Sequence, residues 1–328
     1  MKGLGNASRS PGPVGARTVV VDESAADQRV DNFLLRTLKG VPRSHVYRLL
    51  RGGEVRVNSR RIDATYRLQP GDRVRIPPVR VAGPVARRAP APRDHGLPIA
   101  FEDDALLVVN KPAGLAVHGG SGISFGVIER LRAARPQARV LELAHRLDRE
   151  TSGLLIVAKK RSVLTALHAA LREGRVAKRY LVLVKGAWTG GARNVVLPLR
   201  KYVTSGGERR VSVEEGGQES RTRFERVRAC DGFTLLAARL DTGRTHQIRV
   251  QLAHLGFPIA GDDKYGDFEL NRELARRGLK RMFLHAAELE LVHPTAGTRL
   301  ALTAPLPDDL QRFLDGLAHR IPHHAAPV

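Results

Sequence analysis

Residues 145–160 read HRLDRETSGLLIVAKK, and this stretch decides the fold of the larger part of the chain. The apolar run Leu154–Ala158 lies between Gly153 and a pair of lysines. A short apolar run with such boundaries is typical of a buried strand. Before it we expect Thr151–Gly153 to form a tight polar turn. Asp148 then lies just ahead of a strand, at a position where side chains with chemical roles commonly occur.

Four further runs of the same kind follow the pattern of this strand. They read ALLVVNKPAG (105–114), YLVLVKG (180–186), FTLLAARL (233–240) and HQIRVQL (246–252). Helix-like periodicity appears between some of them, at residues 127–135, 163–173 and 271–277. The sequence therefore predicts an α+β domain over residues 98–320, built on a mixed, mainly antiparallel sheet with flanking helices.

A smaller domain is predicted in front of it, over residues 22–80. Residues 30–38 have helical spacing and end at Gly40 and Pro42, and Ser44 can cap a second short helix. That second helix turns Arg43, Arg48 and Arg51 outward. The runs EVRVN and DRVRIP indicate short strands. Residues 1–21 are interpreted as a flexible tail and residues 81–97, rich in Pro, Ala and Arg, as a linker.

The charge of the chain points to a polyanionic partner. The formal net charge is +22, from 55 Lys and Arg against 33 Asp and Glu. Residues 1–95 hold 19 Lys and Arg against 8 Asp and Glu, a net charge of +11. Nucleic acid is the leading candidate partner, and the front domain with its exposed arginines is expected to bind it.

Cysteine content and hydropathy bound the class of protein. The single cysteine, Cys230, excludes an intramolecular disulfide and a multi-cysteine zinc site, which suits a reducing cytosol. No stretch approaches the roughly 20 apolar residues that span a bilayer. We therefore expect a cytoplasmic protein without membrane contact. The sequence does not determine the oligomeric state, for which a monomer is the default expectation.

Asp148 is the first candidate for a chemical role. A carboxylate acts as a nucleophile or base only when it is ionised, and partial burial raises its pKa. It therefore needs a cationic neighbour. In an extended segment Arg146 and Asp148 share a face, whereas Arg149 points away. Arg146 is thus the better placed of the two, although an arginine distant in sequence could serve as well.

Three other segments place charged or aromatic groups where strands meet loops. Tyr180 opens an apolar run, Arg244, His246 and Arg249 follow the turn at Gly243, and Leu284 and His285 lie in RMFLHA. Each has an ordinary explanation by itself, because a lone tyrosine is usually a core residue and an arginine at a strand start usually meets solvent. Their joint occurrence indicates one site.

The motifs carry a resemblance to a known family. HRLDRETSGLLIVAK, KRYLVLVKG, GRTHQIRVQLAHLGFPIAGDxxYG and FLHAAEL, in this order, resemble the pseudouridine synthases that modify large-subunit ribosomal RNA. The match runs from about residue 99 to residue 305. Residues 28–77 resemble the S4 RNA-binding domain, through RSHVYRLLRGGEVRVN followed by LQPGDRV.

The resemblance implies site-specific conversion of uridine to pseudouridine in large-subunit ribosomal RNA, without a cofactor or a metal. It implies that Asp148 attacks the target nucleotide and pairs with Arg249. Arg146 would enter the RNA stack as the base leaves, and Tyr180 would pack on the flipped base as a candidate proton acceptor from C5. The expected substrate-binding residues are Arg146, His145, Arg244, His246 and Leu284, together with Arg43, Arg48 and Arg51 of the S4-like part.

Two other functions compete with this one. A metal hydrolase could use His118, His145, His246 and His285, but the chain has no HExxH motif. A non-catalytic S4-type RNA-binding or ribosome-assembly factor would explain the charge. A pure binder has little reason to keep a carboxylate such as Asp148 in an anion-binding cleft. The sequence therefore favours the enzyme.

Overall fold

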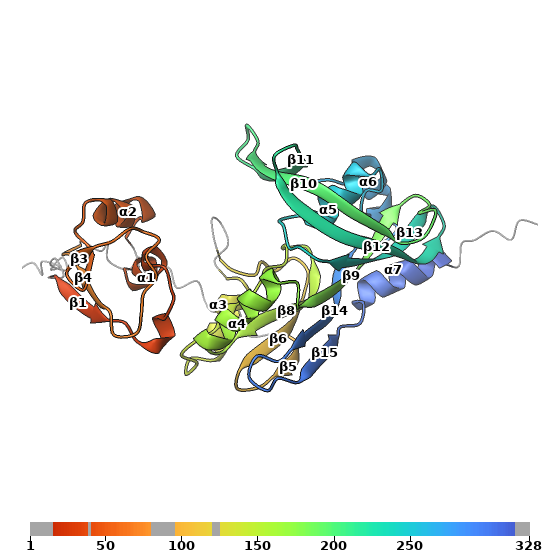
Figure 1. Cartoon of the computed structure of the whole chain (residues 1–328). Coiled ribbons are helices and arrows are strands. Elements are labelled where there is room, and N and C mark those ends of the chain that lie inside the picture. Colours follow the sequence, from red (N-terminus) through yellow and green to blue (C-terminus); the bar gives the residue numbers. More distant parts are fainter. Residues whose placement is uncertain (1–15, 39–40, 80–95, 120–124, 319–328) are drawn as a thin grey trace, which may run out of the picture. The chain divides into compact units, whose positions relative to one another are not determined.

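The chain divides into two compact units, Met1–Ala91 and Pro92–Val328. The computed structural model describes residues 16–38, 41–79, 96–119 and 125–318, which Figure 1 shows in colour. Residues 81–95 of the expected linker and residues 1–15 of the expected tail lie outside these ranges. None of the helices in the described ranges is long and apolar enough to cross a membrane.

In the first unit, two short helices pack on a four-stranded sheet of order β1-β4-β2-β3. The apolar sides of α1 (Val30–Thr37) and α2 (Arg43–Arg51) bury residues such as Phe33 and Leu49 against Val74 of the sheet. The remaining elements are η1 (Glu23–Ala25), β1 (Arg17–Val20), β2 (Arg56–Val57), β3 (Arg60–Arg61) and β4 (Arg73–Ile76).

Two expectations for this unit are wrong in detail. Residues 17–20 of the expected tail form β1, because the β-branched run Thr18–Val20 pairs antiparallel with β4 and closes the sheet edge. The N-cap of α2 is Pro42 rather than Ser44, which lies inside the helix. The φ of Pro42 is fixed by its ring, so the chain is already set for a helix start there.

The second unit is built on an 11-stranded sheet of order β11-β10-β12-β13-β9-β14-β8-β6-β5, with β15 beside β14 and β7 beside β8 (Figure 1). Among the described pairings only β14 and β8 run parallel. The prediction of a mixed, mainly antiparallel sheet in an α+β domain is therefore confirmed. The strands are β5 (Ile99–Glu102), β6 (Leu106–Lys111), β7 (Glu142–Leu143), β8 (Ser152–Ala158), β9 (Ala177–Lys185), β10 (Arg193–Val203), β11 (Arg209–Val213), β12 (Gln218–Cys230), β13 (Phe233–Leu240), β14 (Leu284–Val292) and β15 (Arg299–Thr303).

Helices cover both faces of this sheet. Where β6 and β8 lie, α3 (Val127–Ala134) packs on one face and α4 (Arg161–Arg172) on the other. Where β9 and β13 lie, α5 (Gln247–His254) covers the face that carries Tyr180, and α7 (Asp308–Ala318) with Leu274 of α6 (Phe268–Arg276) covers the opposite face. The predicted helices at 127–135, 163–173 and 271–277 are confirmed as α3, α4 and α6.

The run HQIRVQL was expected to be a strand, and this is wrong, because residues 247–252 belong to α5. All six of these residues are buried. A helix that is buried on every side shows no amphipathic period, so its sequence resembles that of a buried strand.

The expected tight turn at Thr151–Gly153 is also displaced. The turn spans Asp148 to Thr151, whose backbone N–H donates to the Asp148 carbonyl at 3.2 Å, and Ser152 and Gly153 already belong to β8. Gly153 has φ +108°, and a Cβ there would lie 2.2 Å from the carbonyl oxygen of Ala286. The close approach of β8 to β14 therefore requires glycine at this position.

Candidate active site

Asp148 lies in the turn that leads into β8, and a buried lysine holds that turn in place. The Lys111 ammonium at the end of β6 donates to the carbonyls of Pro112, Leu115 and Arg149 at 2.9, 2.8 and 3.0 Å. Burial lowers the pKa of Lys111 to about 7, against the attraction of Glu150 and Asp148. Its three bonds tie the turn after β6 to the turn that carries Asp148.

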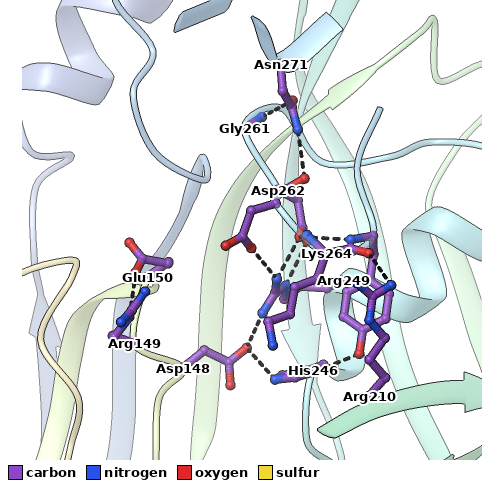
Figure 2. Close-up of polar contacts among 12 residues, drawn as sticks. Asp148, Arg149, Glu150, Arg210, His246, Arg249, Gly261, Asp262, Lys264 and Asn271 are labelled. Carbon is purple, nitrogen blue, oxygen red and sulfur yellow. Dashed lines mark hydrogen bonds and ion pairs between the residues drawn. The ribbon is translucent and has the colours of Figure 1, made fainter. Parts of the chain in front are cut away.

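Arg249 of α5 joins Asp148 to a second carboxylate. Its Nε and Nη2 donate to both oxygens of Asp262 at 2.7 and 2.6 Å, and its Nη1 donates to Asp148 Oδ2 at 3.2 Å (Figure 2). Asp262 is fully buried, and its backbone neighbours Lys264 and Tyr265 donate N–H groups to it as well. The bidentate edge fixes the guanidinium, so its remaining end points at Asp148.

The charge states of this cluster follow from its contacts. Burial by itself would lower the pKa of Arg249, but the bonds to Asp262 and the charge of Asp148 outweigh it and raise that pKa. Burial would likewise raise the pKa of Asp262, and the bonds from Arg249 hold it below its ordinary value. Arg249 and Asp262 therefore remain charged in the folded protein.

Tyr180, on β9, lines the same pocket as Asp148 and Arg249. Its side chain is buried, and burial together with the charge of Asp148 raises its pKa. Its hydroxyl consequently stays protonated at neutral pH.

A pocket of about 210 Å³ brings the predicted residues of the second unit together. Asp148, Tyr180 and Arg249 all line it, although they lie up to 101 residues apart in sequence. Lys178 and Leu240 complete part of its wall. The other predicted residues in the lining are His145, Arg146, Arg244, His246 and Leu284.

Individual predicted residues differ in what else they contact. Arg146 is exposed at the pocket, whereas Arg149 points away and pairs with Glu150 at 2.9 Å (Figure 2). His145 accepts the backbone N–H of Ile156 at its Nε2, and burial lowers its pKa to about 3. It is a neutral ring tied to β8. Arg244 donates through Nε to the Glu219 carbonyl at 3.0 Å.

The predicted arginines of the front unit lie on α2. Arg48 and Arg51 are exposed, and Arg43 is the first residue of the helix, with a side chain outside the described set. Across the described ranges, no group of three or more His, Cys, Asp or Glu side chains is arranged to hold a metal ion.

Sequence reasoning missed two residues of the site. Asp262 holds Arg249, and Tyr265 places its hydroxyl 2.8 Å from His246 Nδ1 while Arg249 lies over its ring. Both belong to the motif GDxxYG, for which the family resemblance implied no role of either residue. The signal was therefore present, but which arginine Asp262 meets depends on the tertiary structure.

Comparisons with known proteins identify the family of the chain. The sequence model of the RNA pseudouridylate synthase family matches residues 105–254, and that of the S4 domain matches residues 28–74. The chain is 52% identical over 310 residues to ribosomal large subunit pseudouridine synthase C of Escherichia coli O157:H7, covering 92% of this chain and 96% of that protein. It is 50% identical over 305 residues to the protein of the same name from Pasteurella multocida, covering 92% and 94%.

Two solved structures of pseudouridylate synthase domain proteins are also similar to the chain. The structure of human RNA pseudouridylate synthase domain containing 4 superposes with a TM-score of 0.56 at 26% identity, over 67% of this chain and 92% of that one. Human RNA pseudouridylate synthase domain containing 1 has the same TM-score at 25% identity, over 71% and 97%.

Proposed function

Because the chain belongs to the RNA pseudouridylate synthase family, we propose that it isomerises uridine to pseudouridine in large-subunit ribosomal RNA, with Asp148 as the essential carboxylate. One observation carries the assignment of Asp148. Its carboxylate lines a pocket, is 19% exposed, and accepts a hydrogen bond from the buried Arg249. The names of the relatives support ribosomal RNA of the large subunit as the substrate.

The reaction needs little beyond positioning and charge. It breaks the N1–C1′ bond, turns the freed uracil and joins C5 to C1′, while C5 loses a proton and N1 gains one. It has no net redox change and adds no external group, so its balance calls for no cofactor. A carboxylate beside C1′ and the base supplies the negative group that this exchange requires.

Arg146 lies where its side chain can occupy the space that the flipped base leaves in the RNA stack. The target base must come out of its stack, which costs a few kcal/mol. Arg146 is exposed at the pocket where Asp148 lies, so its guanidinium is free to enter the vacancy. Lys178 and Arg244 in the pocket wall add positive charge for the phosphates on either side.

Tyr180 is assigned to packing on the flipped base. Its ring lines the pocket, and its raised pKa keeps the phenol neutral. A neutral phenol can donate or accept a hydrogen bond, but taking the proton from C5 would require a phenolate. The packing role therefore has more support than the role of proton acceptor.

The front unit is assigned to RNA anchoring. It matches the S4 domain and exposes Arg48 and Arg51 on α2. Action as a monomer is part of the proposal. A ribosomal RNA substrate supports action in the cytoplasm.

The variant Asp148→Asn tests the assignment, because it keeps the shape of the side chain and removes its charge. We expect kcat for pseudouridine formation to fall by at least roughly 1,000-fold, as for the loss of a nucleophile. RNA affinity should be kept, since one negative charge near phosphates is removed. The matched control is Asp263→Asn, an exposed aspartate 3.4 Å from Arg249. Turnover of Asp148→Asn at the rate of the natural protein would remove Asp148 from the mechanism.

A further inference from the structure

The two oxygens of the Asp148 carboxylate have different surroundings. Arg249 Nη1 donates to Oδ2 at 3.2 Å, and His246 Nε2 lies 3.9 Å from the same oxygen (Figure 2). Within the described ranges no hydrogen bond or ion pair reaches Oδ1. The site therefore distinguishes one oxygen of the carboxylate from the other.

The backbone of His246 is held in an unusual conformation. It precedes α5 with φ +53° and ψ +22°, in the left-handed region. It is the only non-glycine residue with positive φ in the described part of the second unit. L-residues adopt this conformation at a cost, and it is retained mainly where the surrounding structure or function requires it. Here it brings the imidazole beside Asp148.

Tyr265 determines how the other ring nitrogen of His246 is used. The backbone N–H of Val211 donates to the Tyr265 hydroxyl oxygen at 2.9 Å, and that oxygen lies 2.8 Å from His246 Nδ1. The hydroxyl still has one proton to donate. Among the described contacts of this hydroxyl, His246 Nδ1 is the acceptor within reach. Donation from Tyr265 to Nδ1 uses this proton, and in that arrangement Nδ1 is the unprotonated nitrogen.

The position of the His246 proton follows. Burial lowers the pKa of His246, against the attraction of Asp148, so the ring is neutral near pH 8 and carries a single proton. When Nδ1 accepts from Tyr265, that proton is on Nε2, which faces Asp148 Oδ2. In the other tautomer, the Nε2 lone pair would face the carboxylate and the Tyr265 hydroxyl would lose its acceptor.

We propose that Tyr265 fixes His246 in the Nε2–H tautomer, so that His246 and Arg249 together hold Oδ2 of Asp148 and leave Oδ1 as the oxygen that acts on the nucleotide. This inference rests on the proposed function of Asp148. His246 and Tyr265 are positioning residues in it, because they act through the carboxylate. The 3.9 Å separation closes to a hydrogen bond when the substrate fills the pocket, as polar contacts in unliganded sites commonly do.

The network reaches the edge of the sheet. Val211 lies on β11, the outermost strand, which pairs with β10, and its N–H is used by Tyr265. The position of the β10–β11 hairpin thereby sets the Tyr265 hydroxyl, the His246 tautomer and the Asp148 carboxylate in turn. A change in Tyr265 alone should therefore alter the chemistry at Asp148.

The test measures the tautomer and the rate separately. ¹⁵N chemical shifts of the imidazoles in the full-length protein at pH 8 distinguish protonated from unprotonated nitrogen, and the signals lost in His246→Gln identify His246. We expect protonated Nε2 in the natural protein and a shift toward protonated Nδ1 in Tyr265→Phe. Tyr66→Phe is the matched control, because it removes a phenol hydroxyl that donates to Asp72 in the other unit.

Rates of pseudouridine formation on a large-subunit ribosomal RNA transcript give the second measurement. We expect kcat to fall roughly 10- to 100-fold in His246→Phe, the range for loss of one hydrogen bond to a charged group, with KM unchanged. His246→Gln places an N–H near the position of Nε2–H and should recover most of the loss. The kcat of Tyr265→Phe should lie between those of His246→Phe and His246→Gln, and the kcat of Tyr66→Phe should match that of the natural protein.

Two results would overturn the inference: a protonated Nδ1 in the natural protein, or a His246→Phe variant with full kcat. Should Tyr265→Phe fail to fold, the tautomer of the natural protein and the His246 pair still decide the matter. An active Asp148→Asn variant would instead defeat the proposed function itself. If Asp148→Asn is inactive while Tyr265→Phe keeps the natural tautomer and kcat, the role of Tyr265 and His246 is refuted and the proposed function stands.

Discussion

At the scale of single residues, Arg249 has two carboxylate partners with different roles. Asp262 takes the bidentate edge of the guanidinium and is fully buried, whereas Asp148 takes the remaining end and faces the pocket. Asp262 balances the charge of Arg249, and Asp148 adds one negative charge that Arg146 and Lys178 in the pocket wall offset in part. Asp262 thus fixes the arginine that orients the proposed nucleophile.

The pair predicts a large loss of stability in Asp262→Asn. Removing Asp262 leaves the buried Arg249 with only the longer contact to Asp148, so the free energy of unfolding at pH 7 should fall by about 3 kcal/mol. The folded pKa of Asp262 is lowered, so its contribution is complete above the unfolded pKa of about 4 and is lost as pH falls through the folded pKa. The difference between the two proteins should therefore narrow below about pH 4.

Urea unfolding of the natural protein and of Asp262→Asn at pH 7 and at pH 3 measures this difference in the free energy of unfolding. Asp263→Asn is the matched control, because Asp263 is 66% exposed and its contact with Arg249 is 3.4 Å, so solvent screening limits its contribution to below about 1 kcal/mol. A loss in Asp262→Asn no larger than that of the control would contradict the assigned role of Asp262.

At the scale of elements, the register of the large sheet places three arginines in one row. Arg223 of β12 lies opposite Arg239 of β13, and Arg239 lies opposite Arg179 of β9. Arg179 pairs with Glu288 on the next strand, and Arg239 is attracted by Glu290. Like charges directly opposite each other destabilise an antiparallel pair. Arg239 has an arginine opposite it on both neighbouring strands, so it experiences the most charge repulsion of the three.

We therefore predict that Arg239→Thr stabilises the protein. Relief of repulsion and the strand preference of threonine should raise the free energy of unfolding by about 0.5 kcal/mol. The gain should shrink as salt rises, since salt screens exposed charges. Thermal unfolding at low and high ionic strength measures it. In the matched control Arg209→Thr on β11, the residue opposite is Val203, so no salt-dependent gain is expected there. Destabilisation of Arg239→Thr at low salt would show that attraction by Glu290 dominates.

At the scale of the whole molecule, the proposed function assigns RNA binding to the first unit and the chemical step to the second. Each has its own apolar core, of which Leu34 in the first unit and Val182 in the second are fully buried members. The pocket lies within the second unit, whereas half of the formal charge excess lies in residues 1–95. Phosphate contacts govern affinity and its salt dependence, and a pocket governs the rate of the chemical step.

Deletion of residues 1–80 should accordingly weaken RNA binding more than it slows the chemistry. Each lost phosphate contact is expected to reduce the slope of log affinity against log salt by about 1. Single-turnover rates at saturating enzyme should stay within roughly 10-fold of the full chain, because Asp148, Tyr180 and Arg249 remain. Filter binding at several salt concentrations gives the slope. An unchanged affinity and slope would mean that the first unit is not the RNA anchor.

Much of this protein could be predicted from the sequence, because the signals are local. Bounded apolar runs predicted β6, β8, β9 and β13, and helical periodicity predicted α3, α4 and α6. The quoted motifs also named Asp148, Tyr180 and Arg249, the residues that the pocket brings together. Hydrophobic period and motif order are properties of neighbouring residues, so they can be read before the chain folds.

Only the tertiary structure decided the features that depend on distant partners. Residues 247–252 form a helix although their composition suits a strand, because burial on all sides removes the period that distinguishes the two. The motif resemblance already implied that Asp148 pairs with Arg249, and the contact is present across 101 residues. The pairing of Arg249 with Asp262 and the left-handed backbone of His246, by contrast, depend on the packing around α5. Sequence thus determined which groups the site contains, whereas packing determined which atoms face each other. The reason is that hydrogen bonds and ion pairs act over a few ångströms in space, whatever the separation along the chain.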